Sequence, residues 1–203
     1  MLIVINMKHR SYVLKARGDA AQATHQRILQ AGIDLMWEKM SLDITLDDVA
    51  ERSGASVQTV LRHFGTREGL FTAVETALQQ EVVEERRAPA GDVQEAVKVL
   101  FDHYELRGDA VLRLLGQEAW NERIRAGMDI GRRTHRDWVA QAFGPQLGAY
   151  PVAEYEELID LLVVATDVYT WKLLRRDRSL GRQQAEERMK RLIAAILIET
   201  KGM

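Results

Sequence analysis

Apolar residues recur at intervals of three and four along nearly the whole chain, and this spacing limits the possible folds more than any other feature. It places the apolar side chains on one face of an α-helix. We find no convincing alternation of apolar and polar residues and no hairpin signal such as Asn-Gly. The only prolines are Pro89, Pro145 and Pro151, and all lie in segments with Gly or Ala that resemble connections. The sequence therefore predicts an all-α protein.

The chain is long enough for one large or two small domains, because it has 203 residues. Its formal net charge of −2 neither predicts nor excludes a nucleic-acid partner, since a local basic patch decides that question. The sequence contains no cysteine, which excludes disulfides, thiolate zinc sites, cysteine nucleophiles and thiol redox sensing. A chain without cysteine suits a reducing compartment, and we expect the protein in the cytoplasm.

The N-terminal segment lacks the pattern of a signal peptide. Its apolar run from Leu2 to Ile5 is too short, and the positive charges follow this run rather than precede it. We expect residues 1–18 to form a disordered tail, in which Met7 offers a second start codon. The alternative is a basic arm that follows DNA phosphates or enters a minor groove. The basic residues of this arm are Lys8, Arg10, Lys15 and Arg17.

No membrane partner is expected from the hydropathy of the chain. The most apolar run, LIDLLVVATDVYTW, is interrupted by Asp160 and Asp167. It also falls short of the roughly 20 residues that a membrane-spanning helix needs.

Breaks in the apolar periodicity divide the chain into nine expected helices. They span about 21–40, 46–52, 57–64, 67–85, 93–106, 109–120, 122–143, 153–176 and 182–198. The segment RRAPAGD contains Pro and Gly and is the best candidate for a domain boundary.

Two short helices joined by the tight turn SGAS form a helix-turn-helix pattern. Thr45 is a suitable N-cap for the first helix, and Asp48 can complete a capping box. Ala50 is small where the two helices must approach closely. Gly54 can adopt the positive φ of a tight turn, and Val60 can fill the core between the helices. These features together favour a helix-turn-helix over a solvated pair of helices in a bundle.

The second short helix carries side chains suited to reading DNA. Gln can bind adenine and Arg can bind guanine in bidentate fashion in the major groove. Thr and His can reach phosphates, which fix position without reading sequence. Backbone N–H groups in the first turns of the helices can also donate to phosphate oxygens. These helices begin after Thr45, Ser56 and Thr66.

The segment ITLDDVAERSGASVQTVLRHFGTREGLF resembles the DNA-binding signature of TetR-family transcriptional regulators. The resemblance spans Ile28 to Val74, and the segment from Val168 to Leu197 is similar to a C-terminal region of many members. The resemblance implies a homodimer that binds a DNA operator, usually as a repressor, and is released by a small molecule. It implies a helix-turn-helix domain over 19–66, a linking helix over 67–88, and a helical ligand-binding and dimerisation domain over 89–203.

The resemblance also implies which residues face DNA. They are Thr45, Ser56, Val57, Gln58, Thr59, Arg62, His63 and Arg67. Leu61 departs from the family, which commonly has Tyr there with its hydroxyl on a phosphate, so one backbone contact should be missing. Val57 is often polar in relatives, and here it could touch a thymine methyl or pack inward.

The expected helix over 153–176 is apolar on more than one side, which predicts burial on two sides. One side can face its own domain, and the other needs a partner. The last helix has a similar pattern, so two helices from each subunit can form a four-helix dimer interface. The candidate interface residues are Leu161, Val168, Trp171, Met189, Leu192, Ile193 and Ile196.

Aromatic, Met and basic residues on the middle helices predict a pocket for a small apolar or amphipathic ligand, with His or Arg132 as a polar anchor. Plain core packing is the alternative for each of them. The candidate lining residues are Phe101, Tyr104, Trp120, Met128, Arg132, His135 and Trp138.

An enzyme and a helical adaptor are the two alternative function classes. The sequence has no Gly-rich phosphate loop, zinc-binding His-Glu-x-x-His or nucleophile elbow, so we expect neither an enzyme nor a cofactor. His103, His135 and Glu118 could bind a metal, but their spacing does not require it. A helical adaptor that binds another protein is the second alternative. Repressor and activator are not distinguished, because that depends on where the operator lies.

Overall fold

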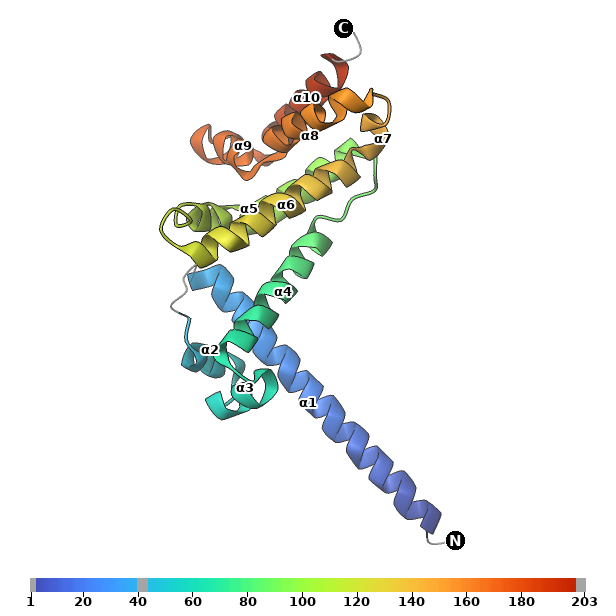
Figure 1. Ribbon diagram of the computed structural model, residues 1–203, viewed down its shortest axis with the longest axis vertical. Helices are drawn as coiled ribbons and strands as arrows, with labels where there is room; N and C mark the ends of the chain where they lie inside the picture. Colours follow the sequence, from blue (N-terminus) through green and yellow to red (C-terminus); the bar gives the residue numbers. More distant parts are fainter. Residues whose placement is uncertain (1–2, 40–43, 200–203) are drawn as a thin grey trace. The chain divides into compact units, whose positions relative to one another are not determined.

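The structure is a computed structural model that describes the backbone of residues 3–39 and 44–199, with side chains described over 16–39 and 44–197. All described regular elements are helices, which confirms the predicted all-α fold (Figure 1). None of the described helices is long and apolar enough to cross a membrane.

The chain divides into two compact units, which are described separately. Unit 1 comprises Met1–Leu78 and unit 2 comprises Gln79–Met203. The division falls within helix α4 (Arg67–Glu85) rather than at the RRAPAGD segment that follows this helix.

Unit 1 contains α1 (Ile3–Lys39), α2 (Leu46–Ser53), α3 (Val57–Phe64) and the first part of α4. α1 packs on α2, and α2 packs on α3. Fully buried Ile28, Val60 and Val74 lie in one core with residues of all four helices. A Cβ on Gly32 would meet Val74 Cγ2 at 2.5 Å, so the absence of a side chain lets α1 and α4 approach closely.

The first helix begins earlier than the sequence analysis predicts. α1 is continuous from Ile3, whereas we expected a tail over 1–18 and a helix from Ala21. The segment contains no proline, and Gly18 costs a helix only about 1 kcal/mol relative to Ala, so no local signal stops the helix. Arg17 of the predicted basic arm is exposed. The side chains of Lys8, Arg10 and Lys15, and residues Met1 and Leu2, lie outside the described part.

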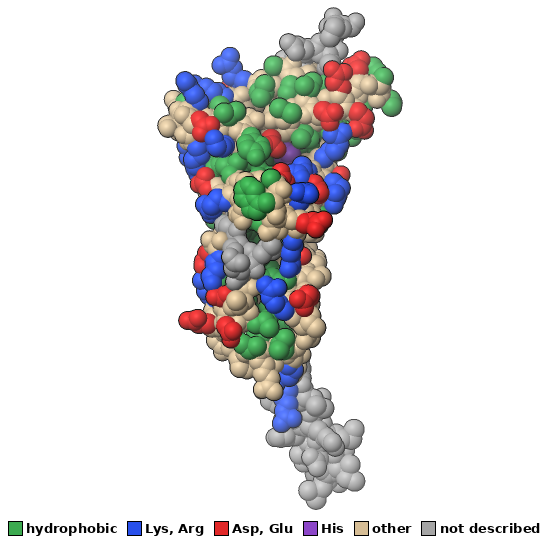
Figure 2. All heavy atoms as spheres, turned by 60° about the vertical axis from the view of Figure 1, so that its left-hand side comes forward, with side chains coloured by type: hydrophobic (Ala, Val, Ile, Leu, Met, Phe, Trp, Pro, Cys, Tyr) green, Lys and Arg blue, Asp and Glu red, His purple; other side chains and the backbone are tan. Residues whose placement is uncertain are grey.

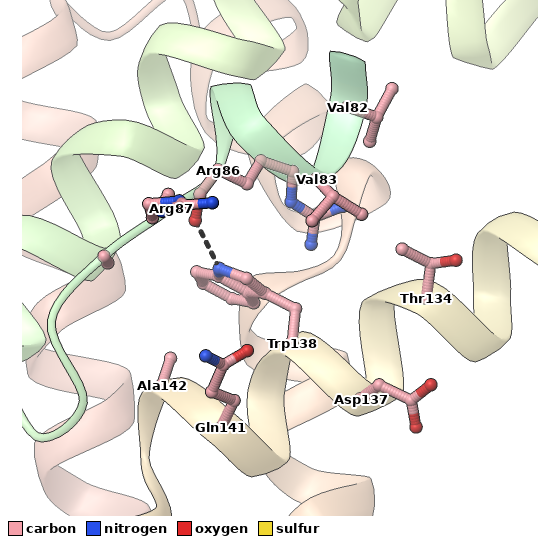
Figure 3. Close-up of a pocket in the computed structure, with 10 residues that line it drawn as sticks. Val82, Val83, Arg86, Arg87, Thr134, Asp137, Trp138, Gln141 and Ala142 are labelled. Carbon is pink, nitrogen blue, oxygen red and sulfur yellow. Dashed lines mark hydrogen bonds between the residues drawn. The ribbon is translucent and has the colours of Figure 1, made fainter. Parts of the chain in front are cut away.

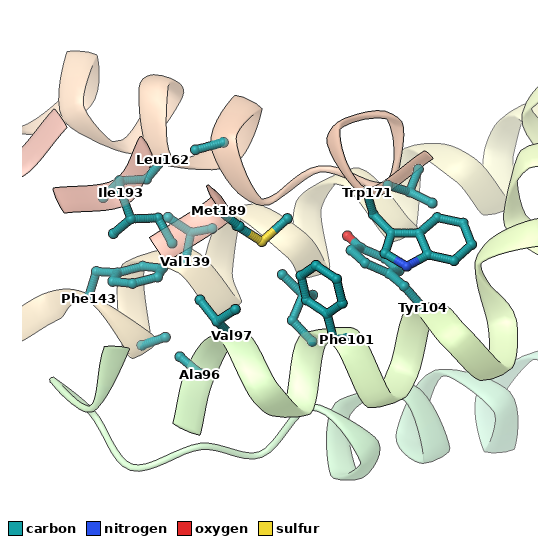
Figure 4. Close-up of a cluster of buried hydrophobic side chains, with 14 of the residues drawn as sticks. Ala96, Val97, Phe101, Tyr104, Val139, Phe143, Leu162, Trp171, Met189 and Ile193 are labelled. Atoms are coloured by element: carbon teal, nitrogen blue, oxygen red, sulfur yellow. The ribbon is translucent and has the colours of Figure 1, made fainter. Parts of the chain in front are cut away.

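Unit 2 is built from the remaining helices. They are α5 (Val93–Leu115), α6 (Glu122–Ala142), α7 (Gly144–Leu147), α8 (Val152–Thr166), α9 (Val168–Lys172), the π-helix η1 (Leu173–Asp177) and α10 (Arg182–Glu199). α5, α6, α8 and α10 pack around one apolar core. In Figure 4, Phe101, Tyr104 and Trp171 lie at one part of this core, and Phe143, Val139 and Ile193 at another.

Two helix boundaries in unit 2 differ from the predicted ones. α5 runs unbroken through Gly108, where we expected an interruption. A Cβ on Gly108 would lie 2.6 Å from the Trp171 ring, so the glycine serves close packing rather than a turn. The helix expected over 153–176 breaks at Asp167, whose backbone is extended and whose carboxylate accepts a hydrogen bond from Tyr169 N at 2.8 Å. Asp167 therefore caps a new helix.

Candidate nucleic-acid interface and ligand cavity

A capping box fixes the start of α2. Thr45 Oγ1 accepts from Asp48 N at 3.1 Å, and Asp48 Oδ2 accepts from Thr45 N at 2.8 Å. The hydroxyl of Thr45 also donates to Asp48 Oδ2 at 2.8 Å. Lys39 Nζ lies 2.5 Å from the other carboxylate oxygen, and these contacts lower the pKa of Asp48, the Lys39 contact most. The Thr45 hydroxyl is therefore used within the protein, and a phosphate here would meet first-turn N–H groups.

The turn between α2 and α3 has the geometry expected from its residues. Gly54 has φ +65° and ψ +25°, in the left-handed region that favours glycine. Its N–H and that of Ala55 donate to carbonyls at the end of α2. Ser56 Oγ then accepts from Thr59 N at 3.1 Å and caps α3. Local chemistry thus sets the start of the second helix.

α3 presents a polar face. Gln58 and Arg62, four residues apart on one face, are exposed, and Thr59 and His63 are half-buried. Val57 is half-buried and packs against the core of unit 1, which favours the inward-packing alternative for this residue. Gln58 and Arg62 are thus the α3 side chains best placed to reach base edges.

His63 lies in a small aromatic group. Its ring centroid is 5.9 Å from that of His25, and His25 stacks on Phe64 at 4.4 Å. Partial desolvation lowers the pKa of His63 below its usual value, helped by the charges of Arg62 and His25. Without DNA, the protonation equilibrium of His63 is therefore shifted towards the neutral ring.

Arg67 has a structural role that sequence reasoning did not identify. Its guanidinium donates to Ile44 O at 3.0 Å and lies 4.7 Å from the centroid of the Phe71 ring. These contacts tie the first turn of α4 to the residue before Thr45. A phosphate contact by Arg67 would compete with them.

Unit 2 contains a cavity of about 550 Å³ between the end of α4 and α6 (Figure 3). This volume suits a small molecule. The lining residues are Val82, Val83, Arg86, Arg87, Ala88, Thr134, Asp137, Trp138, Gln141 and Ala142.

Of the seven residues predicted to line a pocket, only Trp138 lines this cavity. Phe101 and Tyr104 are buried in the core, and the Tyr104 hydroxyl donates to Thr166 O at 3.0 Å. Trp120 is 75% exposed in the turn before α6. Arg132 pairs with Glu118 and Asp129 on the surface, and Met128 is half-buried on α6. These six residues lie away from this cavity, because periodicity shows which face of a helix is apolar but not where packing leaves space.

His135 is buried and bonded rather than exposed to the cavity. Its Nδ1 lies 2.5 Å from an Nη of Arg86, and its Nε2 lies 3.1 Å from Thr166 Oγ1. A guanidinium can only donate, so Nδ1 accepts and the ring proton is on Nε2. Burial, helped by the Arg86 charge, lowers the pKa of His135 to about 3.

The residues missed by the sequence analysis include Arg86. It stands four residues after Val82, at the next position of the apolar stripe of α4. A basic residue where the helix pattern expects an apolar side chain could have indicated that Arg86 is buried.

The residues predicted for a dimer interface fall into two groups. Val168, Trp171, Met189 and Ile193 are buried in the core of unit 2, so they cannot also contact a partner. Leu161 on α8 and Leu192 on α10 are over 40% exposed, and Ile196 is half-buried. The sequence analysis missed Val164, Tyr169 and Leu173, which are apolar and exposed. Figure 2 shows hydrophobic side chains at the surface between mixed charges.

The candidate metal ligands do not converge. His103 Nδ1 lies 2.7 Å from Glu85, whereas His135 contacts Arg86 and Glu118 pairs with Arg132. Within 16–39 and 44–197, no group of three His, Asp or Glu side chains could hold a metal ion.

The fold and the capped, exposed α3 define a helix-turn-helix protein with a helical second unit. Residues 28–74 match the family model described as bacterial regulatory proteins, tetR family. Comparison with curated proteins finds no significant match.

Three solved structures share the fold at low sequence identity. A transcriptional regulator from Rhodococcus sp. Rha1 has a TM-score of 0.62 and 18% identity, over 88% of this chain and 98% of its own. A putative TetR-family regulator from Rhodococcus sp. has a TM-score of 0.60 and 16% identity, over 86% of this chain and 99% of its own. A TetR transcription regulator from Haloarcula marismortui ATCC 43049 has a TM-score of 0.53 and 16% identity, over 88% of this chain and 98% of its own.

Residues 28–74 thus match the DNA-binding region of TetR-family regulators, and the chain shares its fold with the three regulators described above. Members of this family bind DNA and form dimers.

Proposed function

We propose that the protein is a ligand-responsive transcriptional repressor rather than an enzyme, and that it acts on genomic DNA in the cytoplasm. It binds a palindromic operator as a homodimer, and a small apolar or amphipathic molecule releases it. The observation that carries the DNA-binding part is the α3 surface with Gln58 and Arg62, held between the Ser56 cap and the core residue Val60.

A homodimer would present two such helices to successive major grooves about one helical turn apart, which suits a palindromic site. The exposed apolar residues Leu161, Val164 and Leu192 support a partner surface on α8 and α10. α8 and α10 pack on each other within unit 2, so the two helices of one subunit can pair with the same two helices of another.

The cavity supports control by a ligand. α4 begins in unit 1, and its last turn supplies Val82 and Val83 to the cavity of unit 2. A ligand that prefers one position of this turn would change DNA affinity by its differential affinity for the two states. An unchanged operator affinity at saturating ligand would refute this part of the proposal.

Selection of bound fragments from random duplex DNA, followed by salt titration of the winner, tests the function. A palindromic site with steep salt dependence is the expected result. Enrichment of no sequence by a folded, dimeric protein would contradict the proposal.

Two substitutions on α3 test the side chains that are placed to reach base edges. Gln58→Ala should lose about 1–3 kcal/mol of preference for the selected site over random DNA. Arg62→Ala should lower affinity for the site and lower the salt slope. Gln80→Ala, at an exposed glutamine on α4, is the control and should bind like wild type. Equal losses on specific and random DNA for Gln58→Ala would remove Gln58 from the base-reading set.

A further inference from the structure

Arg86 is a buried arginine at the wall of the cavity. It is 6% exposed and follows directly on the last residue of α4. Figure 3 shows its side chain extending beside Val83, with its carbonyl oxygen accepting a hydrogen bond from Trp138 Nε1. The guanidinium carbon lies 4.9 Å from the centroid of the Trp138 ring. The cation is therefore fixed against the aromatic wall of the cavity.

Among the side chains that the structure describes, no carboxylate forms an ion pair with Arg86. Its hydrogen-bond acceptor is His135 Nδ1, on a ring that is neutral because burial depresses its pKa. Arg86 Nε is buried, and no described residue accepts a hydrogen bond from it. An unpaired charge with an unsatisfied donor is costly in a protein interior, so its presence calls for an explanation.

The neighbouring carboxylates are used elsewhere. Glu85 accepts from His103 at 2.7 Å and from Arg107 at 2.9 Å. Asp167 caps Tyr169, and it acts on Arg86 only through space. Neither of them supplies the fork of oxygen acceptors that a guanidinium prefers.

The other charged residues of the cavity are exposed. Arg87 pairs with Glu84 at 2.6 Å, with both side chains largely in water. Asp137 is exposed on α6. The remaining walls are mostly apolar, from Val82, Val83 and Trp138, with Thr134 and Gln141 as neutral polar groups. The cavity thus combines one buried cation with apolar surface.

We infer that this cavity binds an amphipathic carboxylate, with its apolar body against Val82, Val83 and Trp138 and its carboxylate on the guanidinium of Arg86. N–H groups of the guanidinium donate to the carboxylate oxygens, which neutralises the buried charge. This inference deepens the proposed function, because it names the chemical class of the effector.

Matched acid and amide pairs test the inference without DNA. The probes are 1-naphthaleneacetate with 1-naphthaleneacetamide, and decanoate with decanamide, with binding measured by calorimetry. Charged hydrogen bonds are stronger than neutral ones, so wild type should bind at least one acid about tenfold more tightly than its amide. Equal binding of acid and amide, or no binding of any probe at millimolar concentration, would overturn the inference.

Variants assign the preference to Arg86. Arg86→Met should reduce the acid preference to within about twofold, and Arg86→Lys should retain part of it. Arg87→Met is the matched control, because Arg87 also lines the cavity but is exposed and paired, and it should keep the full preference. An acid preference that survives Arg86→Met in a folded protein would assign the anion site to another residue. If Arg86→Met does not fold, comparing the acid preference of Arg86→Lys with that of wild type still tests the inference.

The same probes separate this inference from the proposed function. An acid that binds through Arg86 without changing operator affinity supports the anion site and contradicts release by ligand. If an amide releases the protein from the operator as effectively as the matching acid, this result supports release by ligand and contradicts the anion site.

Discussion

At the scale of single residues, a directed chain of hydrogen bonds crosses the interior of unit 2. Arg86 donates to His135 Nδ1, His135 Nε2 donates to Thr166 Oγ1, and Thr166 Oγ1 donates to Leu162 O at 2.7 Å. The Arg86 guanidinium can only donate, so it fixes the tautomer of His135 with the proton on Nε2. The chain fixes the end of α8, where Thr166 O becomes the acceptor for the Tyr104 hydroxyl.

The buried His135 should make stability depend on pH. Burial lowers its pKa in the folded protein from 6.5 to about 3, so the unfolded chain binds the proton more readily. The contribution of neutral His135 to the free energy of unfolding is fully present above pH 6.5, and it is lost as the pH falls from 6.5 towards 3. From pH 7.5 to 5.5 this residue alone should cost about 1.4 kcal/mol of unfolding free energy. Urea unfolding at both pH values measures the loss.

His135→Gln is the matched variant, because its amide oxygen can accept from Arg86 and it does not titrate. Its stability should fall less than that of wild type over the same pH interval. His103 also has a lowered pKa because of burial, so part of the pH dependence should remain in the variant. Identical pH profiles for the two proteins would contradict the assignment to His135.

At the scale of elements, α3 depends on its ends. A helix of eight residues is too short to be stable alone, so caps and core contacts must hold it. Ser56 caps its first turn, and Gly65 follows its last residue with φ +77°. Val60 anchors its middle in the core with no exposed surface.

Ser56→Ala should lower the free energy of unfolding of unit 1 by about 1 kcal/mol, because Thr59 N loses its acceptor. Operator affinity should fall as well, since the start of α3 frays. Denaturant unfolding followed by circular dichroism measures the first effect, and fluorescence anisotropy with labelled DNA measures the second.

Thr72→Ala, at an exposed site within α4, is the control and should leave stability unchanged or slightly raise it. A stability loss in Ser56→Ala no larger than in Thr72→Ala would show that the cap does not stabilise α3.

At the scale of the whole molecule, the proposed dimer depends on exposed apolar residues rather than on the buried ones first suggested by periodicity. Leu161→Asp should raise the dimer dissociation constant by about 100-fold or more, because a two-fold interface buries the new charge twice. Sedimentation equilibrium measures this change. Leu106→Asp, at an exposed leucine on α5, is the control and should remain dimeric. A fully dimeric Leu161→Asp protein would place the interface elsewhere.

The features that the sequence pattern predicts correctly are local. The helical fold, the capping box of Thr45 and Asp48, and the positive φ of Gly54 follow from interactions within a few residues, so the sequence pattern is sufficient to predict them. The helix-turn-helix was predictable for the same reason.

Features that depend on distant residues follow from packing and could not be predicted from the sequence. Trp171 packs on Gly108, which keeps α5 continuous, and Thr166 with Asp167 divides the long apolar segment. Periodicity marks apolar faces but does not say which of them finds a partner within the chain, so Met189 and Leu192 have opposite exposures. The burial of Arg86 could not be predicted from residue spacing, because it results from the packing of the end of α4 against α6.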